Sequence, residues 1–342
     1  RDNRNAGIDR PEPINIGLDD GYAYTKLALA DGRLVAIPSR ARVGRANVTW
    51  LNEAQHKIAE YKTEDTLYAA GEVDGEPTYF DGYPFSGLNR VIVQHGMQQA
   101  KLGGHSVHAV SGLPVSAFYL KDGSQRTETL EKKRASLKHP VDPIDGRLAA
   151  SVAFHDVIPE ALAAWYDHVI SDKGGEVTLA EERLGAPIAV VDIGGRTTDY
   201  VVVADQAVVH DASGSLRCGL PDMKRQVGEG IRAKYDLEVI GERTVEQAVQ
   251  KGRVRLYGQD QDVSAQVREA KQQVLERVHA ETRRQLGRGA ELDRVLFVGG
   301  GTVALAEHIR DWFPNQAVAE HPAFANARGM LKYLRFVCEL PV

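Results

Sequence analysis

The sequence predicts an α/β protein made of two duplicated domains that face each other across a cleft. Its 342 residues exceed what one hydrophobic core usually organises, so two domains are expected. A strand, a tight acidic loop and a hairpin occur in the first part of the chain and again in the second part. A strand that runs into a glycine cluster and a helix follows near the C-terminal end.

The composition is that of a soluble globular protein. Hydrophobic residues make up 43% of the chain, and no apolar run approaches the ~20 residues that cross a bilayer. The net charge of -5 argues against direct binding to DNA or to an anionic membrane, so any action on DNA is expected to go through a partner. Only two cysteines occur, without the spacing of zinc ligands, and a reducing cytoplasm is the expected compartment. Residues 1–13 are polar and are expected to form a disordered tail.

The duplicated hairpin begins with an apolar strand in each copy, at residues 14–18 and 187–191. Aligning Asp19 with Asp192 gives an offset of 173 residues (192 − 19), and this offset also places Thr25 on Thr198. Any two β-hairpins share some pattern, but a buried strand has no packing use for a terminal Asp, and both copies have one. The repeat therefore predicts two similar domains whose acidic loops face one site.

The residue types in these loops suit a magnesium and phosphate site. Phosphate needs backbone N–H donors at close range, and Gly21, Gly194 and Gly195 let the main chain approach without a Cβ clash. Mg²⁺ on a phosphate tail keeps several waters and touches only one or two carboxylates, so Asp19 and Asp192 are the candidate metal residues, acting through water.

Lys26 lies near the first loop and is a candidate phosphate contact. The plainer alternative is a solvated lysine on a strand.

A second glycine cluster follows the apolar strand that begins at Val295. Gly299, Gly300 and Gly301 lead into a helix that Thr302 is expected to cap, and this order is a common nucleotide-binding arrangement. Alone, the cluster also fits a simple strand-to-helix turn. Together with the two hairpins, it predicts the adenosine side of a nucleotide site.

Two helices are expected in the second domain. The segment 264–286 has an apolar stripe and ends before Gly287, and its charged face is expected to be solvated. Another helix is expected to begin near Asp222, with residues 223–232 bordering the base and ribose.

Glu160 lies between the two hairpins, after Pro159, which is expected to open a helix. An acidic residue in a first helical turn complements the helix dipole. The alternative is catalytic, because a carboxylate here can hold or deprotonate the water that attacks a terminal phosphate. The spacing leaves both interpretations open.

The three loops, LDDGYAYTK, VVDIGGRTTD and FVGGG, resemble the phosphate and adenosine loops of the actin, chaperone and sugar-kinase superfamily, in the same order. Within it, the chain resembles the ParM/StbA family of bacterial actin-like plasmid segregation ATPases, through SGLP, VIPE, IGGRTTD and ARGM, over residues 14–336. The resemblance implies a two-domain actin-like ATPase fold with the nucleotide in the interdomain cleft. Domain I is expected at residues 14–170, completed by 322–342, and domain II at 171–321.

The resemblance also implies a role for each matching residue. Glu160 matches a catalytic glutamate, Asp19 and Asp192 lie on the magnesium side, and residues 299–302 pack against the adenosine and α-phosphate. The phosphate-binding set is Asp19, Asp20, Gly21, Lys26, Gly194, Gly195, Arg196 and Thr197. The implied ligands are ATP or ADP with Mg²⁺.

Two residues depart from the family pattern. Tyr22 stands where actin and ParM have a small serine, so its ring must turn away or reshape the pocket. Arg196 stands where a small residue is commoner, and it is expected to touch phosphate or to face the opposite subunit. The segment 171–187 exceeds a minimal connection and is expected to form an extra surface loop.

The implied function is an ATPase that assembles head to tail into nucleotide-dependent filaments and separates plasmids through a DNA-binding adaptor of ParR type. Neither direct DNA binding nor membrane association is expected. Two alternatives share the fold: a non-polymerising small-metabolite kinase, and a nucleotide-binding scaffold of the FtsA or PilM kind. No separate sugar-binding signature is found, and Glu160 argues against the scaffold.

Overall fold

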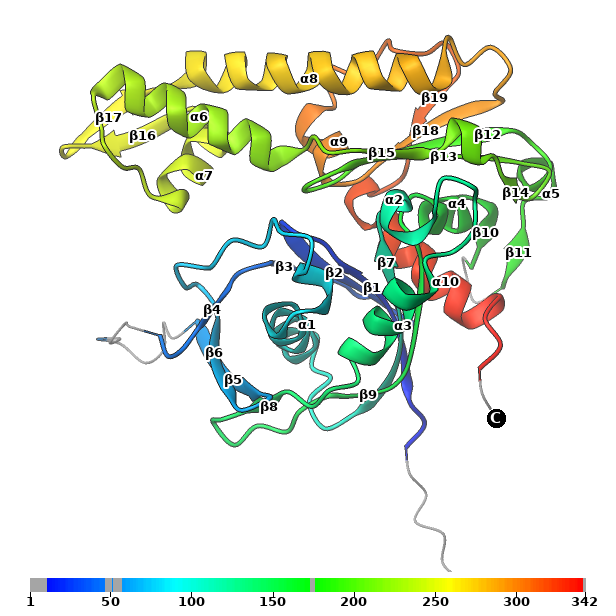
Figure 1. Ribbon diagram of the computed structural model, residues 1–342, viewed down its shortest axis with the longest axis horizontal. Helices are drawn as coiled ribbons and strands as arrows, with labels where there is room; N and C mark the ends of the chain where they lie inside the picture. Colours follow the sequence, from blue (N-terminus) through cyan, green and yellow to red (C-terminus); the bar gives the residue numbers. More distant parts are fainter. Residues whose placement is uncertain (1–10, 47–50, 52–56, 173–175, 341–342) are drawn as a thin grey trace, which may run out of the picture.

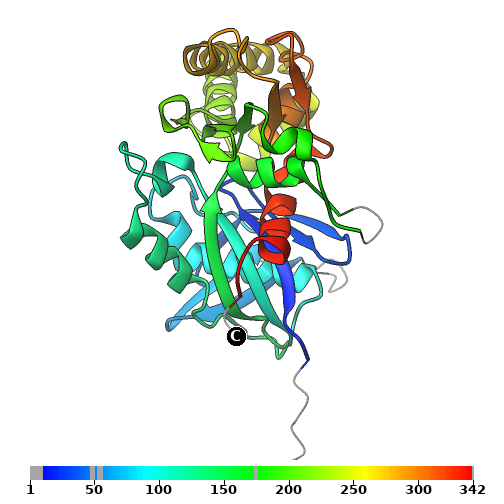
Figure 2. The same cartoon turned by 90° about the vertical axis from the view of Figure 1, so that its right-hand side faces the viewer.

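The computed structural model describes residues 11–46, 51, 57–172 and 176–340. The predicted tail at 1–13 therefore lies mostly outside the described residues. Figures 1 and 2 show two lobes, each built on one main sheet, with α4 and α10 at the junction between them.

The main sheet of the first lobe has the strand order β3-β2-β1-β7-β9. Its strands are β1 (Ile14–Asp20), β2 (Tyr24–Leu29), β3 (Leu34–Pro38), β7 (Ser106–Leu113) and β9 (Ser151–Pro159). β1 pairs antiparallel with β2 and parallel with β7, and β7 pairs parallel with β9.

The main sheet of the second lobe repeats this plan as β14-β13-β12-β18-β19, with β15 along β13. Its strands are β12 (Ile188–Ile193), β13 (Thr198–Ala204), β14 (Ala207–Val208), β15 (Gly214–Leu216), β18 (Arg294–Val298) and β19 (Gln316–Val318). Asp19 faces Lys26 across the first hairpin, and Asp192 faces Asp199 across the second, so both hairpins keep the offset of 173 residues. The prediction of duplicated α/β domains is confirmed.

Helices and short sheets complete the lobes (Figure 1). The helices are α1 (Gly87–Gln99), α2 (Val115–Phe118), α3 (Thr127–Ser136), α4 (Leu162–Val169), α5 (Glu181–Leu184), α6 (Leu220–Tyr235), α7 (Glu242–Lys251), α8 (Ser264–Leu286), α9 (Gly300–Leu305) and α10 (Ala325–Phe336), with 3₁₀ turns at Tyr83–Phe85, His210–Ala212 and Pro322–Phe324. The smaller sheets are β4 (Ala41–Val43), β6 (Thr66–Gly71), β5 (Ile58–Thr63) and β8 (Asp142–Pro143); β10 (Ile170–Ser171) with β11 (Thr178–Leu179); and β16 (Arg253–Leu256) with β17 (Gln259–Asp262). The described part of the predicted surface loop at 171–187 thus contains β11 and α5. Among the described residues, none of the helices has the length and apolar character needed to span a membrane.

Alternate residues of β12 face opposite layers, as strand geometry requires. Ala189 and Val191 pack in the core formed with α6 and α8, whereas Ile188 and Val190 pack in the core formed with α4. The central strand of the second lobe is therefore covered on both faces.

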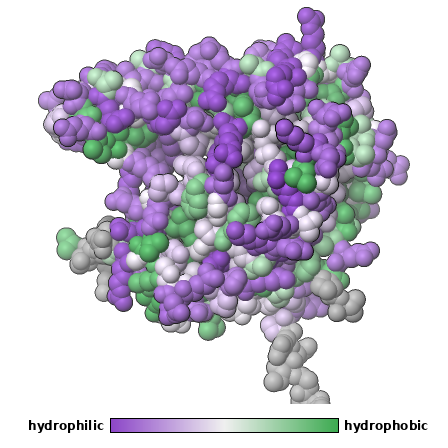
Figure 3. Space-filling model, viewed as in Figure 1, coloured by the Kyte–Doolittle hydropathy of each residue, from purple (hydrophilic) through white to green (hydrophobic). Residues whose placement is uncertain are grey.

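Both helices predicted in the second lobe are present. The helix predicted at 264–286 is α8, and the one predicted near Asp222 is α6. α8 buries the apolar stripe that includes Val267, Ala270 and Val274. Figure 3 shows mainly hydrophilic residues along the edge of the second lobe where α8 lies, so the polar side of this helix faces solvent.

α10 packs on β1 of the first sheet and crosses α4 closely. At Gly329 a Cβ would lie 1.6 Å from the carbonyl oxygen of Ala163, so only glycine permits this crossing. The junction between the lobes is therefore two helices in direct backbone contact.

Two local predictions are wrong. Pro159 ends β9, paired with Leu113, and α4 begins only at Leu162, so Glu160 precedes the helix and does not lie in its first turn. Thr302 does not cap α9, because its hydroxyl donates to the Val298 carbonyl at 2.6 Å while Gly299 occupies the N-cap.

Candidate functional site

The two hairpin loops meet at one cleft between the lobes. A Cβ on Gly195, in the second loop, would lie 3.0 Å from the Cβ of Ala23 in the first. The cavity between the loops measures about 50 Å³ and is also lined by the turn after β9 and the glycine loop before α9. The predicted site residues that line it are Asp19, Gly21, Lys26, Glu160, Asp192, Gly194, Gly195, Arg196, Thr197, Gly299 and Gly300.

Asp19 and Lys26 form a buried ion pair on one wall of the cleft. Lys26 Nζ lies 2.6 Å from Asp19 Oδ2, because the antiparallel register places the two residues opposite each other. Burial alone would lower the pKa of Lys26, but the carboxylates of Asp19, Asp192 and Glu160 raise it overall. Lys26 is therefore a charged ammonium in the cleft and not a solvated strand lysine.

Asp192 carries a buried carboxylate oxygen that accepts no hydrogen bond from any described residue. Its side chain accepts a hydrogen bond from Asn326 Nδ2 to Oδ2 at 2.6 Å, whereas Oδ1 has no partner among the described residues. Burial, then the charges of Asp199 and Asp19, raise the pKa of Asp192 to about 7. A buried, unpaired carboxylate oxygen is costly, so this one is suited to a cation or to an ordered water.

Glu160 lines the same cavity from the turn between β9 and α4. Burial, then the negative charges of Asp199, Asp19 and Asp192, raise the pKa of Glu160 well above its usual range. Its backbone N–H donates to the Leu113 carbonyl at 2.9 Å, which fixes the turn.

Asp199 supports the second loop and was missed by sequence reasoning. It accepts hydrogen bonds from Val115 N at 3.0 Å, from Thr197 Oγ1 at 2.6 Å and from Ser215 Oγ. The signal was present, because the offset of 173 residues places Asp199 on Lys26. The hydroxyl of Thr197 is consequently engaged by Asp199.

Asn326 on α10 is the other residue missed. Besides its bond to Asp192, its Oδ1 accepts from the Ala161 N–H at 3.2 Å, so one amide connects Asp192 to the start of α4. No motif or spacing in the chain points to it.

The structure does not bring every predicted residue to the cleft. Asp20 turns away, and its carboxylate accepts from Lys133 Nζ and, at 2.9 Å, from Asn89 Nδ2. Gly301 and Thr302 also lie outside the cavity lining. At Gly301 a Cβ would come within 2.4 Å of Ile193 Cγ2, so this glycine permits close packing behind the site.

Arg196 and Tyr22 close one side of the cleft. Arg196 Nη2 lies 2.8 Å from Asp81 Oδ1 in the first lobe, and its guanidinium lies 5.1 Å from the centroid of the Tyr22 ring. The Tyr22 ring also packs on Tyr83 with centroids 5.4 Å apart. The ring of Tyr22 thus packs in an aromatic cluster, with the arginine over it.

Within the described part of the chain, no group of three or more His, Cys, Asp or Glu side chains is arranged to hold a metal ion. The carboxylates of Asp19 and Asp192 fit a hydrated cation better than a bare one.

Two family models match the chain in succession. Residues 14–170 match the model of plasmid segregation protein ParM, N-terminal, and residues 190–311 match that of archaeal actin homologue MreB-like, C-terminal. The chain is a ParM-like protein of the actin family.

Solved structures agree on the fold of this ParM-like chain. A pCBH ParM non-polymerisable quadruple mutant is 19% identical, with TM-score 0.76 and coverage of 95% of this chain and 99% of that one. The archaeal actin homologue Ta0583 is 19% identical, with TM-score 0.73 and coverage of 94% and 99%. A 15-stranded ParM filament from Clostridium botulinum is 17% identical, with TM-score 0.74 and coverage of 94% and 99%. No curated protein matches the ParM-like chain in sequence.

Proposed function

We propose that this ParM-like chain is an ATPase that binds ATP or ADP in the cleft between its lobes. The observation that supports this most is the meeting of the two acidic-glycine loops at one cavity, with Asp19 and Asp192 both on its wall. A structure of Ta0583 in complex with ADP, at TM-score 0.71 and 19% identity, supports the choice of ligand.

The phosphate tail would lie against the main chain of Gly21, Gly194 and Gly195, with the charge of Lys26 beside it. The N–H groups of Gly21 and Gly195 would donate to it, because the N–H of Gly194 already donates to the Thr197 carbonyl at 2.9 Å. The adenosine side would be Gly299 and Gly300, which line the cavity at the start of α9. Since ligand pockets usually measure ~300–1,000 Å³, a cavity of about 50 Å³ requires the lobes to separate before a nucleotide enters.

The residues present also fit Mg²⁺ held through water. The unpartnered Oδ1 of Asp192 and the carboxylate of Asp19 would accept from its water ligands. A bound ion would neutralise charge on the phosphates.

Glu160 is the residue we assign to hydrolysis. An ionised carboxylate here would accept a hydrogen bond from water and take its proton as the water attacks the terminal phosphate. Burial and the negative charges of Asp199, Asp19 and Asp192 oppose this ionisation, and the positive charge of Lys26 favours it.

We further propose that the chain polymerises head to tail and segregates plasmid DNA through a ParR-type adaptor in the cytoplasm. ParM and Alp12 filaments are among the similar structures. An open, heterologous contact generates filaments, and ATP that contacts both lobes would favour a closed form suited to assembly. The same proposal includes domain boundaries at residues 14–170 with 322–342, and at 171–321.

Right-angle light scattering, combined with phosphate release in the same sample, tests this function. Addition of ATP and Mg²⁺ should raise scattering, and the signal should decay as phosphate appears. A small-metabolite kinase would consume ATP only with its acceptor, and a scaffold would bind nucleotide without releasing phosphate. Absence of ATP binding by calorimetry would overturn the assignment of the cleft itself.

A further inference from the structure

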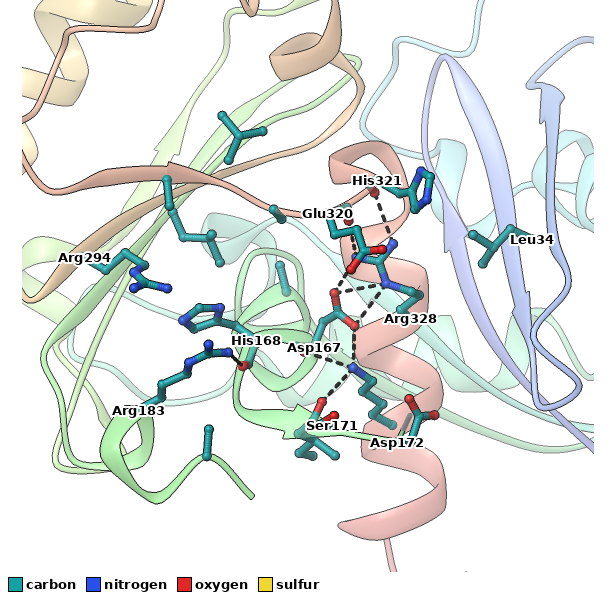
Figure 4. A pocket seen from close by; sticks show the side chains of 18 residues that line it. Leu34, Asp167, His168, Ser171, Asp172, Arg183, Arg294, Glu320, His321 and Arg328 are labelled. Carbon is teal, nitrogen blue, oxygen red and sulfur yellow. Dashed lines mark hydrogen bonds and ion pairs between the residues drawn. The ribbon is translucent and has the colours of Figure 1, made fainter. Parts of the chain in front are cut away.

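A second cavity lies at the C-terminal end of α4, whereas Glu160 precedes the first residue of this helix. Figure 4 shows the side chains that line the cavity. The cavity measures about 640 Å³, which is within the range of small-molecule sites, and α4, α5, β18, β19 and α10 contribute to its wall. None of its lining residues also lines the nucleotide cleft.

On one wall of this cavity, charged side chains form ion pairs with one another. Asp167 on α4 accepts from Arg328 Nη2 at 2.6 Å and from Lys332 Nζ at 2.8 Å, both on α10. The charge of Asp167 is therefore already balanced within the protein. Two further acids line the cavity: Asp172, which lies 3.5 Å from Arg335 Nη1, and Glu320.

The opposite wall holds two guanidinium groups without a carboxylate partner among the described residues. Among the described residues, the guanidinium of Arg183 on α5 donates only to the backbone carbonyl of His168, at 2.9 Å. The guanidinium of Arg294, the first residue of β18, has no hydrogen bond or ion pair with any described residue, although its backbone pairs with Ile188 in the sheet. Figure 4 shows both side chains directed toward the His168 ring from separate elements.

The imidazole of His168 is incompletely bonded as well. Its Nε2 is buried and has no partner in the described part of the chain. Burial, then the charges of Arg183 and Arg294, lower its pKa to about 4, so the ring is neutral near pH 7. A neutral imidazole can donate one hydrogen bond to an anion.

The end of α4 could repel an anion, because carbonyl groups at a helix C-terminus carry partial negative charge. Here they are covered: Arg183 donates to the His168 carbonyl, and Lys332 donates to the carbonyls of Asp167 at 3.0 Å and Ile170 at 2.7 Å. The carbonyl groups at this helix end therefore do not face an anion placed beside Arg183 and Arg294.

We propose that this cavity binds a small organic anion, with its phosphate or carboxylate group between Arg183, Arg294 and His168. Its less polar part packs on Ala317 and Val318 of β19, which line the same cavity. The site is separate from the nucleotide cleft and does not depend on ATP binding there. Two guanidiniums on fixed elements suit a divalent or trivalent anion better than chloride.

NMR of the His168 imidazole tests the site with inorganic phosphate and, in a second arm, with citrate at matched ionic strength. The resonance is assigned by its loss in His168→Gln. An anion that neutralises the two guanidiniums should raise the pKa of His168 by about half a unit or more. A response to phosphate alone, citrate alone or both supports the proposal and identifies the preferred head group.

Arg294→Gln is the decisive variant, because the substitution keeps the backbone pairing of this residue with Ile188, and its guanidinium has no partner among the described residues. The affinity for the anion, measured from the response of the His168 resonance, should fall about tenfold or more in this variant. The matched exposed variant Arg310→Gln should leave that affinity unchanged. Circular dichroism of both variants verifies folding. The proposal is overturned if the His168 resonance of Arg294→Gln responds to the anion as strongly as that of the unsubstituted chain. It is also overturned if the unsubstituted chain responds to neither anion at tens of millimolar.

Discussion

At the scale of single residues, the buried carboxylate of Asp192 lowers the stability of the folded chain at neutral pH, although the proposed function uses it. Its pKa is about 7 in the folded chain and near 3.8 when unfolded. Between these values the folded chain retains a proton that the unfolded chain has lost. The free energy of unfolding therefore falls as pH rises from about 4 to about 7.

Asp192→Asn should consequently stabilise the nucleotide-free protein at pH 7.5, by up to roughly 3 kcal/mol, because it removes a buried charge and keeps the bond to Asn326. The gain should be less than half as large at pH 5, and it should disappear only below about pH 4, where Asp192 of the unfolded chain is protonated as well. Urea unfolding at both pH values measures it. Asp311→Asn, at an exposed position, is the control, and a pH-independent gain would contradict this account of Asp192.

Arg196 and its two partners make a second test possible. Asp81 is 71% exposed, and exposed ion pairs contribute ~0.2–1 kcal/mol, so Asp81→Asn should change ADP affinity by less than about fivefold. Arg196→Gln also removes charge from the cavity wall and should weaken ADP binding by about tenfold or more. Calorimetry with Mg²⁺ present compares them. Equal effects of the two variants would mean that Arg196 acts only through Asp81.

At the scale of elements, the features that could be predicted from the sequence are those with a local or a repeated pattern. Both hairpins, α6 and α8 follow from apolar periodicity and turn residues, and the offset of 173 residues survives in the strand register. The start of α4 was wrong because Pro159 also fits the last position of a strand, where its missing N–H costs no ladder bond. Thr302 was misassigned because a buried hydroxyl can bond back to the carbonyl four residues earlier.

The glycine loop before α9 offers a matched pair of substitutions. Gly299 has φ +91°, and a Cβ there would lie 2.2 Å from Asp192 Oδ1 and 2.4 Å from the Ile193 carbonyl. At Gly300 a Cβ would meet nothing within 4 Å. Gly299→Ala should therefore displace Asp192 and reduce ADP affinity by about tenfold or more, whereas Gly300→Ala should have little effect on folding.

Thermal unfolding and ADP titration of both alanine variants provide the measurement. A Gly299→Ala protein with unchanged melting temperature and unchanged affinity would show that the loop does not constrain Asp192.

At the scale of the whole molecule, the site depends on contacts that no local pattern encodes. Asn326 reaches Asp192 across 134 positions of sequence, and Arg40 of the first lobe pairs with Glu246 of α7 at 2.7 Å. Such pairs form only after α10 has returned to the first sheet and the lobes have closed. Sequence reasoning therefore found the loops that line the cleft but not the side chains that hold them together.

If closure of the lobes couples nucleotide hydrolysis in the cleft to filament assembly, a variant that binds ATP without hydrolysing it should form longer-lived filaments. Glu160→Gln tests this coupling. Glutamine keeps the size of the side chain and removes the carboxylate that would take a proton from water, so ATP binding should persist while phosphate release falls by about 10²-fold or more. Removing one of several crowded acids should also leave the fold stable. Filaments formed with ATP should then outlast those of the unsubstituted chain.

Light scattering after a limiting addition of ATP, with electron microscopy of the same samples, follows filament lifetime. In the unsubstituted chain, phosphate release should be slower at acidic pH and rise as Glu160 ionises, above the usual range of a glutamate because its pKa is raised. The Glu160→Gln variant should lack that rise. Filaments that disassemble at the same rate in both proteins, despite the lost hydrolysis, would separate assembly from the chemistry of the cleft, since lifetime would no longer follow the nucleotide.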